Sequence, residues 1–350
     1  MLPDVSTPRP SPAAREATWI RRVGTLSGVT LAFLAVLGSL PILLPLAALY
    51  DVMRGTRFTA VRVVLFAAVF LTCELVGVAA AAILFLHEWV ARPAEHGRAN
   101  EADDRFHALE RRWALAIFRG AQTVFGFRVE IEPGSDTGLG PIIAFVRHAS
   151  IADTLLPVVL LAPRGLRFRY VLKHELRFDP CLDLVGHRLP NTFVRRSSGD
   201  AEREIGEIAR LADGLGPRDA VVIYPEGTRF TEAKRERVLA KLDASGDLEA
   251  AARARRLSNV LPPHLGGPLG LLERNTGADV VFLAHAGFEG IATFWDLWAG
   301  ALVGATIRVA LWRVPFADIP KDREDRIAWL HAHWRLVDDW VGAQRARGRA

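Results

Sequence analysis

Residues 142–153, IIAFVRHASIAD, contain the clearest indication of the fold class. The first five residues are all apolar, as in a strand that is buried on both faces, and polar residues follow from Arg147 onward. Ser150 is a favourable helix N-cap, and Asp153 lies three residues later, as in a capping box. The stretch therefore predicts a strand that ends at Val146, a short turn and then a helix, which is the repeating unit of a layered α/β domain.

The same alternation of strand and helix patterns continues to the end of the chain. The densely charged stretch 229–258 predicts a solvated helical excursion, and apolar residues at helical spacing between Ile327 and Val341 predict a C-terminal amphipathic helix. The fold class that we predict is α/β, with a mixed sheet flanked by helices. We expect strands at 141–146, 168–171, 192–194, 220–224, 280–284 and 305–311, and helices at 154–161, 201–211 and 265–275.

Half of the 350 residues are hydrophobic, but they are distributed unevenly. Residues 23–50 carry no formal charge, and residues 63–86 carry only Glu74. Because a helix rises about 1.5 Å per residue and a bilayer core is about 30 Å thick, either run is long enough to cross a membrane. This excludes a fully soluble enzyme as the default interpretation. We divide the chain into a disordered tail (1–18), a two-helix membrane hairpin (19–90), an amphipathic connecting helix (91–130) and a main domain (131–350).

The two outer ends of the hairpin carry Trp19 and Trp89, where an aromatic belt would lie if both ends reach the same membrane interface. Arginines in the tail and after the hairpin favour both ends on the cytoplasmic side, although three further arginines lie in the connection 51–62. Pro41 and Pro45 predict a kink in the first helix. Two full spans and a re-entrant hairpin buried in one leaflet therefore both remain open.

The inventory of motifs excludes several chemistries. The two cysteines, Cys73 and Cys181, form no disulfide framework, and Cys181 is expected to be a buried small residue. A Gly-x-Ser-x-Gly elbow, a His-Glu-x-x-His pair, a Cys-x-x-Cys pair and the glycine patterns of nucleotide-binding loops are all absent from the sequence. We therefore expect no cofactor, no metal and no nucleic-acid partner. His285, His331 and His333 show no ligand spacing and are interpreted as structural or surface residues.

Two places carry candidate chemistry. With His148 in the turn and Asp153 in the first turn of the following helix, a carboxylate can hold one imidazole nitrogen and leave the other as a base. The second place is AVVIYPEGTR, residues 220–229, at the carboxyl end of a predicted strand, where ligands bind in open α/β sheets. Gly227, Thr228 and Arg229 there form a plausible phosphate cradle, which Glu226 would support by orienting Arg229.

Together, His-x4-Asp and the later Pro-Glu-Gly-Thr-Arg resemble the motifs of the 1-acylglycerol-3-phosphate acyltransferase family, the glycerolipid or PlsC-like acyltransferases. The stretch 173–196, from Lys-His-Glu-Leu to Asn-Thr-Phe-Val-Arg-Arg, resembles that family's second motif, with Phe193 and Arg196 as matches. Pro190 and Arg195 depart from it. Residues 260–263 and 312–320 resemble the lysophosphatidate and lysocardiolipin acyltransferase branch.

The resemblance implies transfer of an acyl group from acyl-CoA to the free hydroxyl of a lysophospholipid, with 1-acyl-sn-glycerol-3-phosphate as the expected acceptor. His148 would be the general base, Asp153 its partner, and the phosphate would bind at residues 226–229 with Phe193 and Arg196. Acyl-CoA is then a co-substrate, the membrane lipid a partner, and the domain lies on the cytoplasmic side of the cell membrane. An acyl carrier protein as donor, another lysolipid as acceptor, and a lipid-binding protein without turnover remain alternatives.

Overall fold

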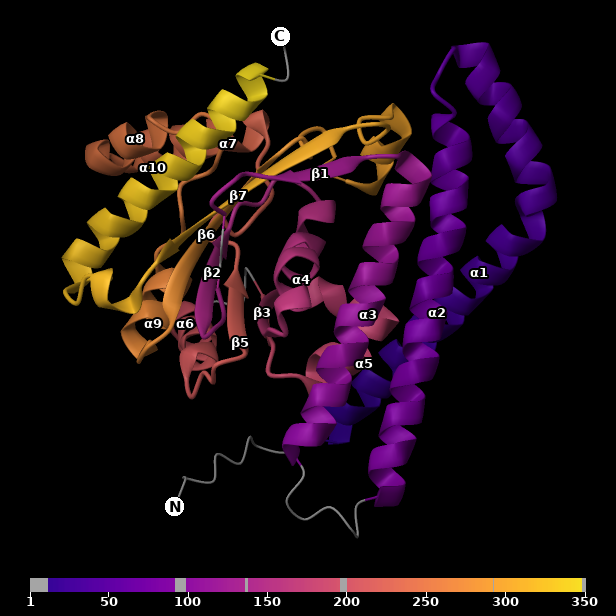
Figure 1. Ribbon diagram of the computed structural model, residues 1–350, viewed down its shortest axis with the longest axis horizontal. Helices are drawn as coiled ribbons and strands as arrows, with labels where there is room; N and C mark the ends of the chain where they lie inside the picture. The colour runs from indigo at the N-terminus through magenta and orange to yellow at the C-terminus, as the bar shows by residue number, and fades with distance from the viewer. Residues whose placement is uncertain (1–11, 92–98, 136–137, 196–199, 292, 348–350) are drawn as a thin grey trace.

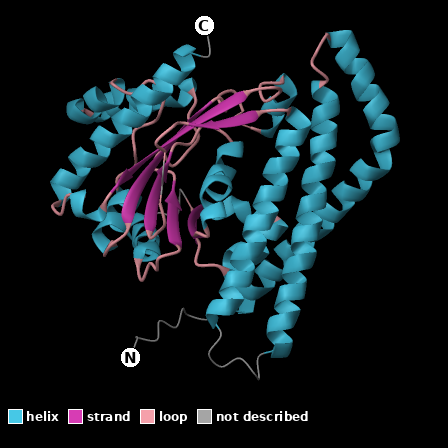
Figure 2. Cartoon of the chain, viewed as in Figure 1, coloured by secondary structure: helices cyan, strands magenta, loops and turns pink. Residues whose placement is uncertain are grey.

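A computed structural model describes residues 12–91, 99–135, 138–195, 200–291 and 293–347 (Figure 1). Long helices come first, and shorter helices then alternate with strands up to a long C-terminal helix (Figure 2). The sheet has helices on both faces, and the long N-terminal helices lie to one side of it. The helices are α1 (Pro12–Arg54), α2 (Thr59–Ala91), α3 (Ala99–Phe125), α4 (Leu156–Leu161), α5 (Pro180–Arg188), α6 (Ala201–Ala209), α7 (Glu232–Ser245), α8 (Leu248–Arg255), α9 (Gly266–Arg274) and α10 (Arg323–Arg347).

Within the described residues, seven strands form one mixed sheet in the order β1-β7-β6-β2-β5-β3-β4. The pairs from β6 to β4 are all parallel, whereas β7 is antiparallel to β6 and parallel to β1. The carboxyl ends of β2 to β6 therefore meet at one edge of the sheet, where ligands bind in such folds. The strands are β1 (Arg128–Ile131), β2 (Ile142–Val146), β3 (Arg167–Lys173), β4 (Thr192–Val194), β5 (Asp219–Ile223), β6 (Asp279–Ala286) and β7 (Thr306–Val314).

The central strand β2 is buried on both faces because successive side chains point to opposite sides of the sheet. Ile142, Ala144 and Val146 belong to the core beneath α3 and α4, whereas Ile143 and Phe145 belong to the core beneath α6, α9 and α10. Burial of side chains of this size stabilises the fold by about 1.5–3 kcal/mol each. The apolar run in the sequence is thus explained by two cores on either side of the sheet.

Helix α2 lies against the globular domain at its start, its middle and its end. At the start, Thr59 lies so close to Gly300 of the globular domain that a Cβ added to this glycine would be only 2.9 Å from the Thr59 hydroxyl. In the middle, the Trp113 indole of α3 donates to Glu74 at 3.0 Å, and at the end Arg188 of α5 pairs with Glu88 at 2.8 Å. The hairpin therefore runs alongside the domain over the whole of α2, as the parallel ribbons of α2 and α3 show in Figure 1.

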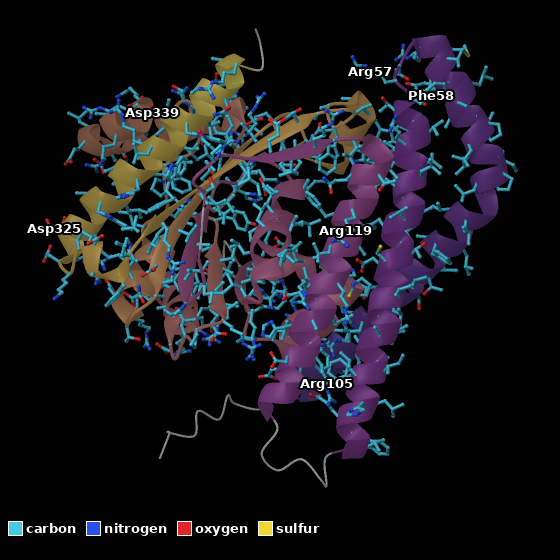
Figure 3. All side chains as sticks on the ribbon, viewed as in Figure 1. Arg57, Phe58, Arg105, Arg119, Asp325 and Asp339 are labelled. Atoms are coloured by element: carbon cyan, nitrogen blue, oxygen red, sulfur yellow. The ribbon has the colours of Figure 1, made fainter. Side chains whose placement is uncertain are left out.

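The outer surface of the hairpin is apolar and exposed. Both α1 and α2 are long and apolar enough to cross a membrane, and the most apolar window of α1 has 0% of its residues buried. Arg57 and Phe58 lie at the tip of the hairpin (Figure 3). The ribbon of α1 bends along its length in Figure 1, and Pro41 and Pro45 lie inside it. An exposed apolar face of this extent is typical of a membrane-contacting surface.

Several predicted boundaries differ from the structure. Residues 1–11 lie outside the described residues, whereas 12–18, assigned to a disordered tail, form the first turns of α1. Strand β1 overlaps the end of the predicted connecting helix and was missed, because a strand of four mostly exposed residues is too short to give a clear pattern. The expected excursion 229–258 contains two helices, α7 and α8, each capped by the side chain of the preceding residue, Thr231 and Asp247 respectively. The α/β class itself is confirmed.

Candidate active site

The turn after β2 brings His148 and Asp153 together. The Nδ1 of His148 lies 2.9 Å from Oδ1 of Asp153, and because a carboxylate only accepts, Nδ1 is the donor. The His148 side chain is 15% exposed, whereas that of Asp153 is 0% exposed. Among the described residues no polar atom bonds Nε2 of His148, so this nitrogen is the one available to a ligand.

Local backbone geometry fixes the carboxylate. Oδ2 of Asp153 accepts the backbone N–H groups of Ala149 and Ser150, each at 2.6 Å. The predicted capping box is half right: Asp153 reaches back to Ser150, but the Ser150 hydroxyl accepts from Ala152 and donates to Ile291. The element that begins here is the 3₁₀ turn η1 (Ala152–Leu155), which leads into α4. Asp153 therefore lies within a single tight turn beside His148.

Electrostatics favour the ionised form of Asp153. Its burial alone would raise the pKa, but the neighbouring His148 and His285 hold that pKa well below the ordinary carboxyl range. The Tyr224 ring lies 4.7 Å from the His148 ring, centroid to centroid, and burial together with the Asp153 charge raises the pKa of Tyr224 well above its usual value. The site thus combines a buried carboxylate, a partly exposed imidazole and a neutral phenol.

The Pro-Glu-Gly-Thr-Arg segment, which follows the neighbouring strand β5, holds the backbone of His148 by hydrogen bonds. Oε1 of Glu226 accepts the His148 N–H at 2.7 Å, and the Phe230 N–H donates to the His148 carbonyl at 2.7 Å. The structure therefore brings together the two motifs that the sequence places far apart.

Glu226 bonds backbone groups in the structure, whereas the sequence predicted that it orients Arg229. It is 1% exposed, and its second oxygen accepts the Leu261 N–H at 2.8 Å, so both oxygens hold backbone rather than ligand. Burial raises the pKa of Glu226 to about 8. Its role in the structure is to join the His148 turn to the segment at Leu261.

Gly227 is required by its surroundings in two ways. Its φ is +63°, in the left-handed region that favours glycine, and a Cβ there would meet Cδ2 of His264 at 2.8 Å. His264 was not singled out from the sequence; its backbone N–H donates to Pro225 at 2.8 Å and brings its ring over the turn.

Thr228 and Arg229 lie in the same turn, half-buried. Lys234 at the start of α7 donates from Nζ to the Thr228 hydroxyl and to the Arg229 carbonyl, both at 2.9 Å. The turn therefore contains Arg229 and is contacted by the Lys234 ammonium from α7, at the sheet edge that holds His148. Sequence reasoning missed Lys234, although it is one of only a few lysines and follows Arg229 closely.

The predicted second motif lies farther along the sheet. Phe193 belongs to β4, which is separated from β2 by β5 and β3, and its ring stacks on His187 of α5 at 4.5 Å. Arg196 lies outside the described residues. Arg195 donates its backbone N–H to Glu204 at 3.0 Å and approaches His174 at 2.9 Å. The structure does not bring Phe193 into contact with the His148 pair.

A second histidine and a buried arginine complete the surroundings of the pair. His285, interpreted from sequence as a structural or surface residue, is fully buried on β6, with Nε2 3.3 Å from Oδ2 of Asp153. Arg147 is also fully buried and donates to the carbonyls of His285 and Asn259 and to Glu289. His285 precedes the last residue of β6, and only the pairing of β6 with β2 in the sheet brings it beside Asp153.

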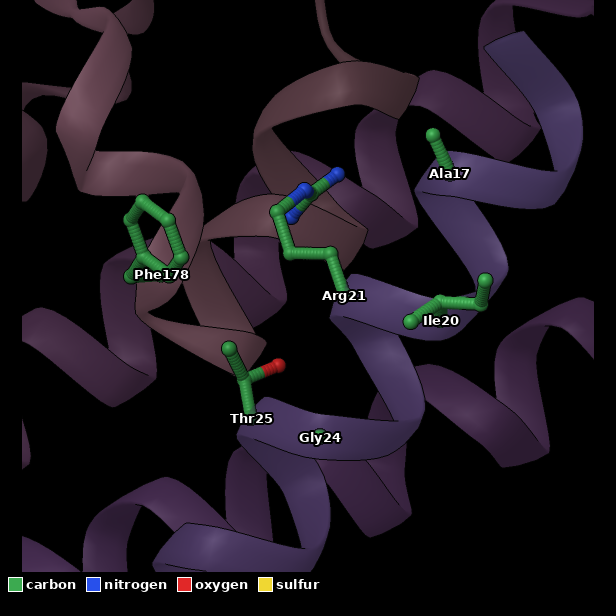
Figure 4. Close-up of a pocket in the computed structure, with 6 residues that line it drawn as sticks. All are labelled: Ala17, Ile20, Arg21, Gly24, Thr25 and Phe178. Atoms are coloured by element: carbon green, nitrogen blue, oxygen red, sulfur yellow. The ribbon is translucent and has the colours of Figure 1, made fainter. Parts of the chain in front are cut away.

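Two surface hollows lie away from His148 and Asp153. One, of about 560 Å³, lies between the start of α1 and Phe178, with Arg21 pointing toward the domain and Ile20 and Thr25 on the helix (Figure 4). The other, of about 510 Å³, is lined by residues from β6, β7 and α10. Neither is lined by His148. Among the described residues, no group of three or more His, Cys, Asp or Glu side chains is arranged so that it could hold a metal ion.

Comparisons with known proteins agree with the motifs. A family model described as Acyltransferase matches residues 128–266. The probable 1-acyl-sn-glycerol-3-phosphate acyltransferase 5 of Arabidopsis thaliana is 29% identical over 174 residues, covering 49% of this chain and 44% of that protein. The 1-acyl-sn-glycerol-3-phosphate acyltransferase epsilon of Mus musculus is 20% identical over 247 residues, covering 67% of this chain and 66% of that protein. The matched region thus spans less than two thirds of either relative.

Among solved structures, the crystal structure of the 1-acyl-sn-glycerophosphate (LPA) acyltransferase, PlsC, from Thermotoga maritima aligns with a TM-score of 0.45. The alignment has 17% sequence identity and covers 79% of this chain and 96% of that chain. The matched family region 128–266 contains His148, Asp153 and the Gly227–Arg229 turn. The chain therefore contains a region, residues 128–266, that matches the Acyltransferase family model, and it is similar in sequence to 1-acyl-sn-glycerol-3-phosphate acyltransferases.

Proposed function

We propose that the protein transfers a fatty acyl group from a thioester donor, acyl-CoA, to the free hydroxyl of a lysophospholipid, with 1-acyl-sn-glycerol-3-phosphate as the first acceptor to test. The observation that carries this proposal is the His148–Asp153 bond of 2.9 Å at the sheet edge, which leaves Nε2 of His148 as a base. The family match and the relatives named above support the acceptor class.

In the proposed reaction, Nε2 of His148 removes the proton from the lysolipid hydroxyl as its oxygen attacks the thioester carbonyl. Asp153 holds the proton on Nδ1 and stabilises the imidazolium that forms. The new C–O bond forms, the C–S bond breaks, and the leaving thiolate takes the proton from His148. General-base assistance contributes about 10²–10⁴-fold, so positioning of both substrates supplies much of the remaining acceleration.

The acceptor's phosphate would be positioned by the turn after β5. Arg229 and Lys234 place two cations there, and Gly227 keeps the turn free of a side chain at the left-handed position. Charge-assisted bonds to phosphate are about twice as strong as neutral ones, so this turn favours an anionic headgroup over a neutral lipid. Phe193, which lies on β4 farther along the sheet, and Arg196 remain proposed contacts of the same substrate.

The hairpin would hold this edge against the membrane. Because α2 contacts the domain from Thr59 to Glu88, lipid cannot surround it, so we propose that the exposed face of the hairpin lies in one leaflet rather than crossing the bilayer. The domain would lie on the cytoplasmic side of the cell membrane, where acyl-CoA is made.

The decisive assay uses purified full-length protein in lipid micelles, acyl-CoA, and a panel of lysophospholipids that differ in headgroup. Thiol release that requires a lysolipid, together with a product containing two acyl chains, is the expected result. Replacing acyl-CoA by acylated carrier protein tests the donor. Thiol release without an acceptor would instead indicate a thioesterase, and absence of release with every pair would indicate lipid binding alone.

Two histidine variants give the matched comparison. His148→Ala removes the proposed base and is expected to abolish turnover, whereas His331→Ala alters a half-buried histidine on α10 and keeps wild-type turnover. Near-wild-type activity of His148→Ala would refute the mechanism. Thermal unfolding of both variants verifies that each is folded.

A further inference from the structure

We infer that His285 is a positioning residue of the proposed acyl transfer: it holds the Asp153 carboxylate from the side opposite His148, so that the site is a His–Asp–His array rather than a pair. The inference rests on the function proposed above. His285 lies on β6, far from His148 in sequence, and the sequence pattern gave it no role in the reaction.

The geometry places the two imidazoles on different oxygens of one carboxylate. His148 Nδ1 lies 2.9 Å from Oδ1, and His285 Nε2 lies 3.3 Å from Oδ2. Both Asp153 and His285 have side chains that are 0% exposed. Water therefore does not compete for this contact, and a bond to a buried carboxylate contributes more than the same bond at a surface.

The proton on His285 is fixed by a second acceptor. Nε2 also lies 3.0 Å from the carbonyl oxygen of Arg147, which can only accept, so Nε2 carries the proton that faces both Arg147 and Asp153. The buried Nδ1 of His285 has no hydrogen-bond partner among the described residues. A proton on Nδ1 would need an acceptor, and none lies beside it among the described residues, so the single N–H of the ring is the one at Nε2.

The same contact ties two strand ends together. Arg147 closes the loop from the other side, because its guanidinium donates to the His285 carbonyl at 2.6 Å. The ends of β2 and β6 are therefore joined by two reciprocal bonds directly beneath the His148 turn. Asp153 is thus held by two backbone N–H groups from its own turn and by an imidazole from another strand.

Three variants test the inference. His285→Gln retains a donor at the position of Nε2, His285→Leu removes it with similar volume, and His333→Leu makes the same change at a histidine that packs on Phe282 of the same strand. We expect kcat of His285→Leu to fall about 10- to 100-fold with little change in the acceptor KM, because the N–H that lies 3.3 Å from the charged Asp153 carboxylate is lost. His285→Gln recovers most of kcat, and His333→Leu stays at the wild-type value.

A second measurement does not depend on turnover. In ¹⁵N-histidine-labelled protein, the proton on His148 Nδ1 is assigned by its loss in His148→Gln. In His285→Leu this resonance is expected to move to lower field, because Asp153 with one donor fewer is a stronger acceptor, and His285→Gln leaves it near its wild-type position. A resonance unmoved in His285→Leu, or kcat equal in the Leu and Gln variants, overturns the inference. Absence of acyl transfer by the wild type refutes the proposed function and leaves the resonance to decide on His285.

Discussion

Substitution of Asp153 by asparagine separates the chemistry of the site from its stability. Three N–H groups converge on Oδ2, those of Ala149, Ser150 and His285, whereas Oδ1 faces only Nδ1 of His148. The asparagine must therefore place its oxygen at the Oδ2 position and its NH₂ group toward His148. Nδ1 of His148 then has to accept, its proton moves to Nε2, and the base is lost.

The expected magnitude is a fall in kcat of about 10⁴-fold, as for the corresponding change in a Ser-His-Asp triad, with little change in acceptor KM. Asp153→Ala gives a different result, because it leaves the buried N–H groups of Ala149 and Ser150 without partners. Each unsatisfied group costs about 1–3 kcal/mol, so the alanine variant should lose about 2–6 kcal/mol of unfolding free energy that the asparagine variant keeps.

Steady-state thiol release gives kcat, and urea unfolding gives the free energy for both variants. If Asp153→Asn keeps kcat within tenfold of the wild type, the assignment of the His148 tautomer is wrong. If Asp153→Ala is as stable as Asp153→Asn, the two backbone bonds do not stabilise the turn.

Three further predictions concern other parts of the molecule. Because burial raises the pKa of Glu226 to about 8, the folded chain retains a proton that the unfolded chain releases near pH 4–5. The unfolding free energy of the wild type therefore falls as the pH rises from about 5 to 8, and that of Glu226→Gln lacks this dependence on pH. Urea unfolding that gives the same dependence on pH for both proteins would contradict the prediction. Gly227→Ala places a Cβ against His264 at φ +63°, whereas Gly246→Ala, at φ +74°, has nothing within 4 Å of its Cβ. The first variant should therefore lose about 1–3 kcal/mol more unfolding free energy than the second. Equal losses in thermal unfolding would show that the contact with His264 does not destabilise the variant. With both native cysteines replaced, single cysteines at Arg57 and Asp325 should react with an impermeant maleimide from the same side of sealed vesicles, whereas labelling from opposite sides would show that the hairpin crosses.

The sequence was sufficient for the features that depend on local pattern. The apolar runs of β2, β5 and β6, helix α6 and the two long N-terminal helices all follow from periodicity and composition. The His148 pair was also predicted, because its partner lies only five residues away. Strand β1 was not, since its neighbour β7 supplies the pairing from about 180 residues downstream.

The rest of the site depends on contacts that only the folded sheet creates. Glu226 was assigned to Arg229 because the two are close in sequence, whereas its partners are the backbone of His148 and Leu261. His285 was dismissed because it lacks neighbours with ligand spacing, although β6 lies directly beside β2 in the sheet. A long-range hydrogen bond leaves no local pattern, so these two roles were not predictable from one sequence.

The clamp on the His148 backbone has a consequence for biosynthesis of the protein. Its two bonds come from Glu226 and Phe230, so a nascent chain that has emerged only as far as β3 has the His148–Asp153 turn but nothing to hold it in place. Contacts of such large sequence separation form late in folding, because loop closure precedes them. In the proposed reaction, a chain in which β5 has not yet joined the sheet therefore has no ordered base at this edge.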